Sequence, residues 1–112
     1  MEINNLNTDP KLSKIVESLK KELSPTRLFL YGSRANGTAR SDSDYDFVAV
    51  LSSFDSKLRH EVMARLSSQL WKDHDAEVQV WVYSQADFDD WSDEFSSTPE
   101  TALNTGIEIS LI

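Results

Sequence analysis

The chain has 112 residues with no cysteine, a net charge of −8 at pH 7, and 39% hydrophobic and 27% charged residues. This length predicts a single domain over residues 1–112, with a core of its own but no room for a separate substrate domain. The composition excludes a disulfide framework and a thiolate metal site, no apolar run approaches the ~18 residues that span a membrane, and the acidic balance argues against direct nucleic-acid binding.

The first half of the chain predicts a helix followed by two buried strands. Asp9 and Pro10 are typical of a helix start, and apolar side chains recur at three- and four-residue steps over residues 10–23, as on one face of a helix. Residues 27–31 are apolar and aromatic, which predicts a buried strand. Residues 44–51 predict a second strand in a central position, because its later part is apolar on both faces.

The second half of the chain alternates between predicted helices and strands. A helix is expected over about residues 55–72, a third strand over residues 76–83, and a short helix capped by Ser84. Another short helix begins at Thr98, and residues 107–112 alternate apolar and polar side chains, as a final edge strand does. The apolar stripe of the longer helix consists of Leu58, Val62, Leu66 and Leu70. The fold class is therefore α/β (α+β), with a mixed central sheet of about three to five strands flanked by helices.

Gly32 and Ser33 follow directly on the first predicted strand. Backbone N–H groups at a helix start attract anions, glycine lets a phosphate approach the backbone, and serine adds a hydroxyl donor. Taken alone, a Gly-Ser pair at a strand end is more often a plain turn, and the Gly-Lys-Ser/Thr of a Walker-type loop does not occur. The pair is a candidate phosphate-binding corner only in combination with another signal.

Asp44 and Asp46 open the second predicted strand. Residues two apart on a strand share a face, so these two carboxylates lie side by side and repel each other. A divalent cation removes this repulsion, and Mg²⁺ typically takes one or two carboxylates together with substrate phosphates. Taken alone, an Asp-x-Asp pair is more often an exposed acidic turn.

The two pairs together are more specific than either one. Ten residues separate Ser33 from Asp44, and chance would match four such positions in roughly two chains per thousand of this length. Residues 32–47, from Gly32-Ser33 to Asp44-x-Asp46, resemble the signature of the minimal nucleotidyltransferases (MNT proteins) of the DNA polymerase beta superfamily. The resemblance extends over nearly the whole chain, with a less specific match in the closing segment from Thr101 to Ile107.

The resemblance implies a nucleotidyltransferase fold and a mechanism. Gly32 and Ser33 would hold the outer phosphates of ATP or another nucleoside triphosphate, and Asp44 and Asp46 would ligate one or two Mg²⁺ ions. An acceptor hydroxyl would attack the α-phosphate and release pyrophosphate. Catalysis would then come from positioning and from neutralising the charge that develops.

The chain departs from the superfamily at the third carboxylate, which relatives usually carry on the next core strand. Gln79 occupies that place, and an amide cannot accept a proton as a carboxylate does. Glu77 lies two residues earlier on the same strand face and is a candidate substitute for the catalytic role. An exposed strand-end charge is the favoured interpretation of Glu77, and Asp75 is a weaker candidate.

The aromatic and histidine residues carry weaker signals. Trp71, Trp81 and Trp91 are expected to be buried packing residues, with Trp81 the best candidate for stacking a nucleobase because it shares a face with Gln79. His60 and His74 are scattered, which argues against a zinc site.

Three functions remain open. The first is an enzyme that transfers a nucleotidyl group, AMP above all, to a partner protein, because small family members commonly act as antitoxins beside a HEPN-type ribonuclease toxin. The second is a catalytically degenerate module that binds the same partner. The third is an antibiotic-modifying enzyme, which would need a second domain or a dimeric site. We expect a cytoplasmic location, with the oligomeric state left open, and an acidic surface suited to a basic protein partner or to cations.

Overall fold

The computed structural model describes residues 9–111, so the expectation that the polar residues 1–8 contain no secretory signal lies outside it. In chain order the elements are α1 (Pro10–Leu23), β1 (Arg27–Tyr31), α2 (Ser33–Asn36), β2 (Tyr45–Leu51), a short 3₁₀ turn (Ser56–Leu58), α3 (Arg59–His74), β3 (Val78–Ser84), α4 (Gln85–Trp91), α5 (Thr98–Thr105) and β4 (Ile107–Glu108). Within the described residues, none of the helices combines the length and the apolar character needed to cross a bilayer.

The strands form one mixed sheet in the order β3-β2-β1-β4. β1 is antiparallel to both β2 and β4, whereas β2 and β3 are parallel and are connected through α3. A parallel pair needs a crossover of this kind, which explains why the longest helix lies between these two strands in the sequence. The predicted mixed sheet flanked by helices is confirmed.

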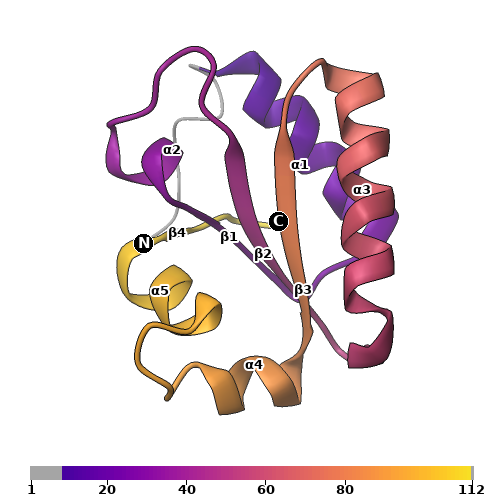
Figure 1. Cartoon of the computed structure of the whole chain (residues 1–112), viewed down its shortest axis with the longest axis vertical. Coiled ribbons are helices and arrows are strands. Elements are labelled where there is room, and N and C mark those ends of the chain that lie inside the picture. Colours follow the sequence, from indigo (N-terminus) through magenta and orange to yellow (C-terminus); the bar gives the residue numbers. More distant parts are fainter. Residues whose placement is uncertain (1–8, 112) are drawn as a thin grey trace.

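The two faces of the sheet are covered unequally. Helices α1 and α3 pack on one face over most of its length, through buried side chains such as Ile15, Leu19 and Leu66. The other face carries α4 and α5, which place Phe88 and Ala102 on the sheet. Figure 1 shows α4 at the end of the sheet away from α2, whereas α5 lies between α4 and α2, with Gly106 at its end close to Leu30 and Tyr31. On the part of this second face nearest α2, which is the open face of the sheet, Gln79 is exposed and Asp46 is half-buried.

Helix α3 differs from its prediction at both ends. It begins at Arg59 and runs to His74, and Asp75 then ends it in the left-handed conformation with a φ of 52°. Leu58 belongs to the preceding 3₁₀ turn and is 45% exposed, so it is not part of the buried stripe. Met63 is buried instead, because the helical spacing starts only where the α-helix itself starts.

Strands β2 and β3 begin later than predicted. The ladder between β2 and β3 opens with the bond from the Tyr45 N–H to the Glu77 carbonyl at 2.9 Å, so Asp44 and Glu77 both lie just before their strands. The final strand is shorter than residues 107–112, since only Ile107–Glu108 pair with β1.

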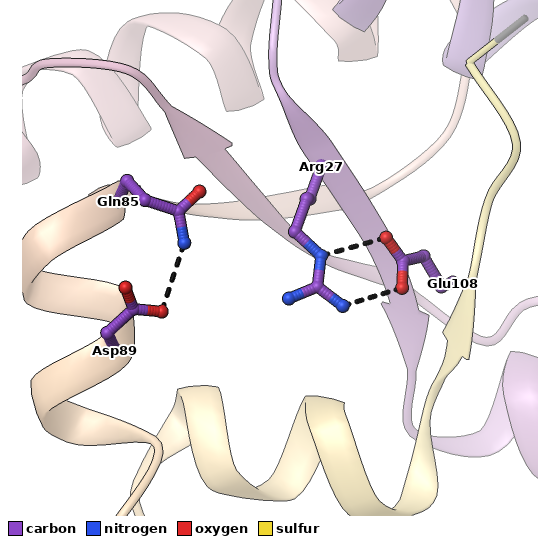
Figure 2. Close-up of polar contacts among 4 residues, drawn as sticks. All are labelled: Arg27, Gln85, Asp89 and Glu108. Atoms are coloured by element: carbon purple, nitrogen blue, oxygen red, sulfur yellow. Dashed lines mark hydrogen bonds and ion pairs between the residues drawn. The ribbon is translucent and has the colours of Figure 1, made fainter.

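A salt bridge links β1 to β4, the strand at one edge of the sheet (Figure 2). Arg27 of β1 donates from Nε and Nη2 to the two carboxylate oxygens of Glu108 in β4, at 2.9 and 2.7 Å. The same guanidinium lies 4.8 Å from the ring centre of Phe29. The bond and charge of Arg27 lower the pKa of Glu108 below its ordinary value. An ionised Glu108 therefore adds a side-chain contact to the backbone pairing between β1 and β4.

Replacing Glu108 with glutamine is expected to lower the free energy of unfolding by about 0.5–1 kcal/mol at neutral pH, because the pair is partly exposed to solvent. A carboxylate with a lowered pKa stabilises the fold above its unfolded-state pKa and loses that contribution as the pH falls through the folded-state value. The difference between wild type and variant should therefore vanish toward acid pH in urea titrations. Glu94→Gln, at an exposed position, serves as the control, and a difference that persists in acid would contradict the ion-pair explanation.

Candidate functional site

The corner after β1 requires glycine. Gly32 has a φ of 76° and a ψ of −155°, a conformation that other residues rarely adopt, and it caps the single helical turn α2. The Gly32 carbonyl accepts bonds from the N–H groups of Ala35 and Asn36 at 3.0 and 3.2 Å. The N–H groups of Ser33 and Arg34 begin this turn and have no carbonyl partner within it. The turn therefore has free donors beside the Ser33 hydroxyl, the arrangement expected of an anion-binding corner.

The Asp46 carboxylate lies against this corner. Asp46 pairs with Tyr31, the residue before Gly32, in the ladder between β1 and β2. A Cβ atom placed on Gly32 would lie 2.8 Å from Asp46 Oδ2, which is closer than such atoms approach. Burial, and next the neighbouring Asp44, raise the pKa of Asp46 above its ordinary value. The glycine-serine corner and one acidic side chain of the predicted site are thus brought together, as the sequence indicated.

Asp44 lies on the same face as Asp46, one residue before β2, and is exposed. Glu77 also lies just before its strand, and its carbonyl accepts the bond from the N–H of Tyr45, the residue after Asp44. The hydrogen-bonding contact with Asp44, followed by the charge of Asp44, raises the pKa of Glu77. Three carboxylates therefore lie along one end of β2 and β3, and each has at least one like-charged neighbour.

Gln79 stands directly beside Asp46 in the parallel ladder between β2 and β3. Its side chain is exposed and shares the open face with Asp46. The resemblance predicts Gln79 at the place of a third carboxylate, and the register puts it next to Asp46. Among residues 9–111, no three acidic or histidine side chains are grouped so that they could hold a metal ion by themselves. The two aspartates can hold Mg²⁺ only with further oxygens from phosphate or water, which is how Mg²⁺ is usually bound.

Tyr31 and Trp81 complete the open face, and the sequence singled out only the second of them. Tyr31 is half-buried, and burial, and next the charge of Asp46, raise its pKa to about 12. The Trp81 side chain is in hydrogen-bonding contact with Tyr31 and is partly buried, on the same face as Gln79 as expected. The alternation of β1 could have identified Tyr31, since it shares a strand face with Phe29 and directly precedes the glycine.

The prediction of burial was wrong for two tryptophans. Trp71 on α3 is 52% exposed and Trp91 at the end of α4 is 50% exposed. Trp71 instead forms one wall of a groove of about 560 Å³ beside the outer edge of β3. The groove reaches the carboxylates of the open face, and its lining comprises Asp44, Ser67, Ser68, Trp71, Glu77, Val78 and Gln79. A side chain from another molecule could reach Asp44 through this groove.

The remaining candidate residues of the sequence lie outside the open face of the sheet. Asp75 ends α3, and its carbonyl accepts a bond from Lys11 Nζ at 3.1 Å. His74 bonds to Ser18 Oγ through Nε2 at 2.9 Å, which ties α3 to α1. His60 is exposed near the start of α3.

Replacing Gly32 with alanine is expected to lower the free energy of unfolding by about 1–3 kcal/mol, because alanine is strained at a φ of 76°. The new Cβ would also displace the Asp46 carboxylate, so the variant should lose metal-dependent nucleotide binding even at temperatures where it is folded. Gly37→Ala is the matched control, since Gly37 also has a positive φ but has open space around it. Equal losses of binding in the two variants would show that the approach of Asp46 to Gly32 is unimportant.

Comparison with known proteins agrees with this geometry. The family model described as "Polymerase beta, Nucleotidyltransferase" matches residues 13–95, which is most of the chain and contains every residue of the open face described above. None of the curated proteins gives a significant match.

Three solved structures share the fold. A toxin–antitoxin with AMP-PNP is 20% identical, with a TM-score of 0.56 over 88% of this chain and 69% of that one. A mutant of the toxin–antitoxin MntA-HpeT is 19% identical, with a TM-score of 0.57 over 86% of this chain and 69% of that one. A nucleotidyltransferase structure from Sulfolobus solfataricus is 20% identical, with a TM-score of 0.52 over 72% of this chain and 70% of that one.

Proposed function

The chain belongs to the polymerase beta nucleotidyltransferase family, and from this premise we propose that it transfers a nucleoside monophosphate, AMP from ATP, to a hydroxyl group on a partner protein. Gly32 and Ser33 hold the outer phosphates through the free N–H groups and the hydroxyl at the start of α2. Asp44 and Asp46 are the residues that would hold Mg²⁺. When bound, Mg²⁺ neutralises charge on the triphosphate and orients it for attack.

The approach of the Asp46 carboxylate to Gly32 is the observation that carries this proposal. A ligand bound by the backbone of the corner is necessarily adjacent to Asp46, because Oδ2 lies 2.8 Å from where a Gly32 Cβ would be. A carboxylate beside a phosphate site is repulsive unless a cation lies between the two. Burial, and next the charge of Asp44, raise the pKa of Asp46, and a bound Mg²⁺ would oppose both effects.

The acceptor hydroxyl enters from the groove beside β3. Direct displacement at the α-phosphate places the attacking and leaving oxygens roughly in line. With the outer phosphates at the β1 side of Asp46, the attacking oxygen comes from the β3 side, where the groove reaches Asp44 and Glu77. Glu77 is the carboxylate available there to receive the proton of the hydroxyl, since Gln79 cannot.

The acceptor is proposed to belong to a protein, and the chain to act as an antitoxin toward a HEPN-type toxin in the cytoplasm, where ATP is available. Two of the similar structures are toxin–antitoxin complexes, one of them with AMP-PNP. The groove is open along one side and is bounded by the exposed Trp71, which suits a protruding side chain of a partner. A net charge of −8 suits a basic partner surface.

A second candidate function is favoured by Gln79. Its amide occupies the place beside Asp46 where a third carboxylate would complete the metal site. The chain would then bind nucleotide and partner without transferring anything, and the fold would serve as a recognition module.

The test is incubation of the protein with α-labelled ATP, Mg²⁺ and the candidate toxin, which is the product of the neighbouring gene. Transfer of label to the toxin that is lost in Asp44→Asn supports the enzyme. Transfer that survives in Asp44→Asn would contradict the proposed site, and the absence of transfer with partner binding intact would favour the recognition module. Glu77→Gln then tests the base, because it should slow transfer without weakening nucleotide binding.

A further inference from the structure

Arg34 directly follows the Gly-Ser pair, a position from which an arginine side chain could bind phosphate. Its guanidinium instead forms hydrogen bonds to the backbone before Asp44. Nη2 donates to the Ser43 carbonyl at 2.8 Å and to the Ser41 carbonyl at 3.3 Å, and Nε donates to the Ser43 carbonyl at 3.3 Å. The guanidinium carbon also lies 4.2 Å from the centre of the Tyr45 ring. Arg34 therefore binds the segment that precedes Asp44.

These contacts place the Arg34 guanidinium on the far side of the sheet from the open face. Tyr45 lies between Asp44 and Asp46 in the sequence, so its side chain points to the opposite face, where it is buried with the residues under α1. Its hydroxyl donates to Asp9 Oδ2 at 2.9 Å, and Asp9 in turn caps α1. The cation stacked on this ring thus faces α1 rather than the phosphate corner.

Asp44 lies outside regular secondary structure, so its position depends on contacts made by the residues next to it. Residues 37–44 between α2 and β2 form no helix or strand. In the part next to Asp44, the Ser43 N–H donates to the Arg40 carbonyl at 3.1 Å and the Arg40 N–H donates to Ser43 Oγ at 2.8 Å. On one side of Asp44 the Ser43 carbonyl is held by Arg34. On the other side the Tyr45 N–H enters the sheet at Glu77. The direction of the Asp44 side chain is set by these two anchors.

We infer that the Arg34 side chain has a positioning role: it fixes Asp44 relative to the Gly32-Ser33 corner without touching nucleotide or metal. The inference rests on the proposed function for its consequence, since a fixed Asp44 matters only if it ligates a cation. Lysine cannot replace Arg34, because an ammonium group lacks the planar fork that bonds two carbonyls while stacking on an aromatic ring.

Amide hydrogen exchange of the free protein tests the positioning itself. Arg34→Gln and Arg34→Lys should both speed exchange of the Ser43 and Tyr45 amides about tenfold, with the amides of α1 and β1 unchanged. Arg40→Gln is the matched control, since Arg40 is an exposed arginine in the same segment. Unchanged exchange at Ser43 and Tyr45, or equally faster exchange through the whole protein, would overturn the inference.

Measurements of metal and nucleotide binding test whether the positioning of Asp44 by Arg34 affects metal binding. In Arg34→Lys, Mn²⁺ should bind about tenfold more weakly in the presence of a non-hydrolysable ATP analogue. Binding of the same analogue in EDTA should be unchanged. Weaker binding in EDTA would mean that Arg34 contacts phosphate and would contradict the positioning role. If the wild type bound no Mn²⁺, the proposed function would fail, and the exchange measurement would still decide whether Arg34 positions Asp44.

Discussion

Asp46→Asn is expected to remove metal-dependent nucleotide binding while leaving the fold at least as stable as the wild type. The amide is a poor ligand for Mg²⁺, so binding of ATP with Mg²⁺ should weaken by at least about 100-fold. The fold should not suffer, because burial and Asp44 raise the pKa of Asp46 and so make its charge unfavourable. Calorimetric titration and thermal unfolding measure the two effects on one sample.

The pH dependence of stability gives this prediction a second check. A carboxylate with a raised pKa destabilises the fold above its folded-state pKa, and the penalty disappears as the pH falls through that value. The melting temperature of Asp46→Asn should therefore exceed that of the wild type at neutral pH and converge with it in acid. Asp42→Asn is the control for the loss of one exposed acidic charge. A variant that melts lower than the wild type at pH 7 would show that Asp46 is structural.

Gln79→Asp is expected to raise the rate of nucleotidyl transfer by about 100-fold, the contribution typical of a positioned general base. Gln79 is the direct neighbour of Asp46 in the ladder, so a carboxylate there would join the metal site without any movement of the backbone. The same change adds a like charge beside Asp46, and the free protein should become less stable unless Mg²⁺ and nucleotide are present.

Gln79→Asn is the control for this gain, since asparagine has the shape of aspartate without its charge. Transfer rates under single-turnover conditions, with and without Mg²⁺, should separate the two variants. A rate that remains unchanged in Gln79→Asp, with nucleotide and partner bound, would mean that the missing carboxylate is not what limits the chemistry.

Much of the fold could be predicted because local signals and burial agree. The cap at Asp9, the apolar face of α1 and the aromatic strand β1 each occur where the sequence indicates. The sequence-based predictions were wrong where tertiary contacts determine the end of a helix or the burial of a side chain. The start of α3 at Arg59 depends on a 3₁₀ turn that periodicity does not reveal. The exposure of Trp71 depends on β3 being an edge strand, which leaves a groove beside it.

The site was predictable as far as spacing determines geometry. The pairing of Tyr31 with Asp46 places the end of β1 beside the start of β2, so the corner and the carboxylate meet. The contribution of Arg34 was not predictable, because its bonds go to backbone carbonyls of an irregular segment, and these leave no mark in the sequence.

The most direct measurement is paramagnetic broadening of amide resonances by Mn²⁺ bound together with a non-hydrolysable ATP analogue. Broadening should centre on Gly32, Asp44 and Asp46 and fade toward α4, and it should be absent in Asp46→Asn. Broadening centred instead on the acidic residues of α4, or spread evenly over the surface, would contradict a cation held between the glycine-serine corner and the two aspartates.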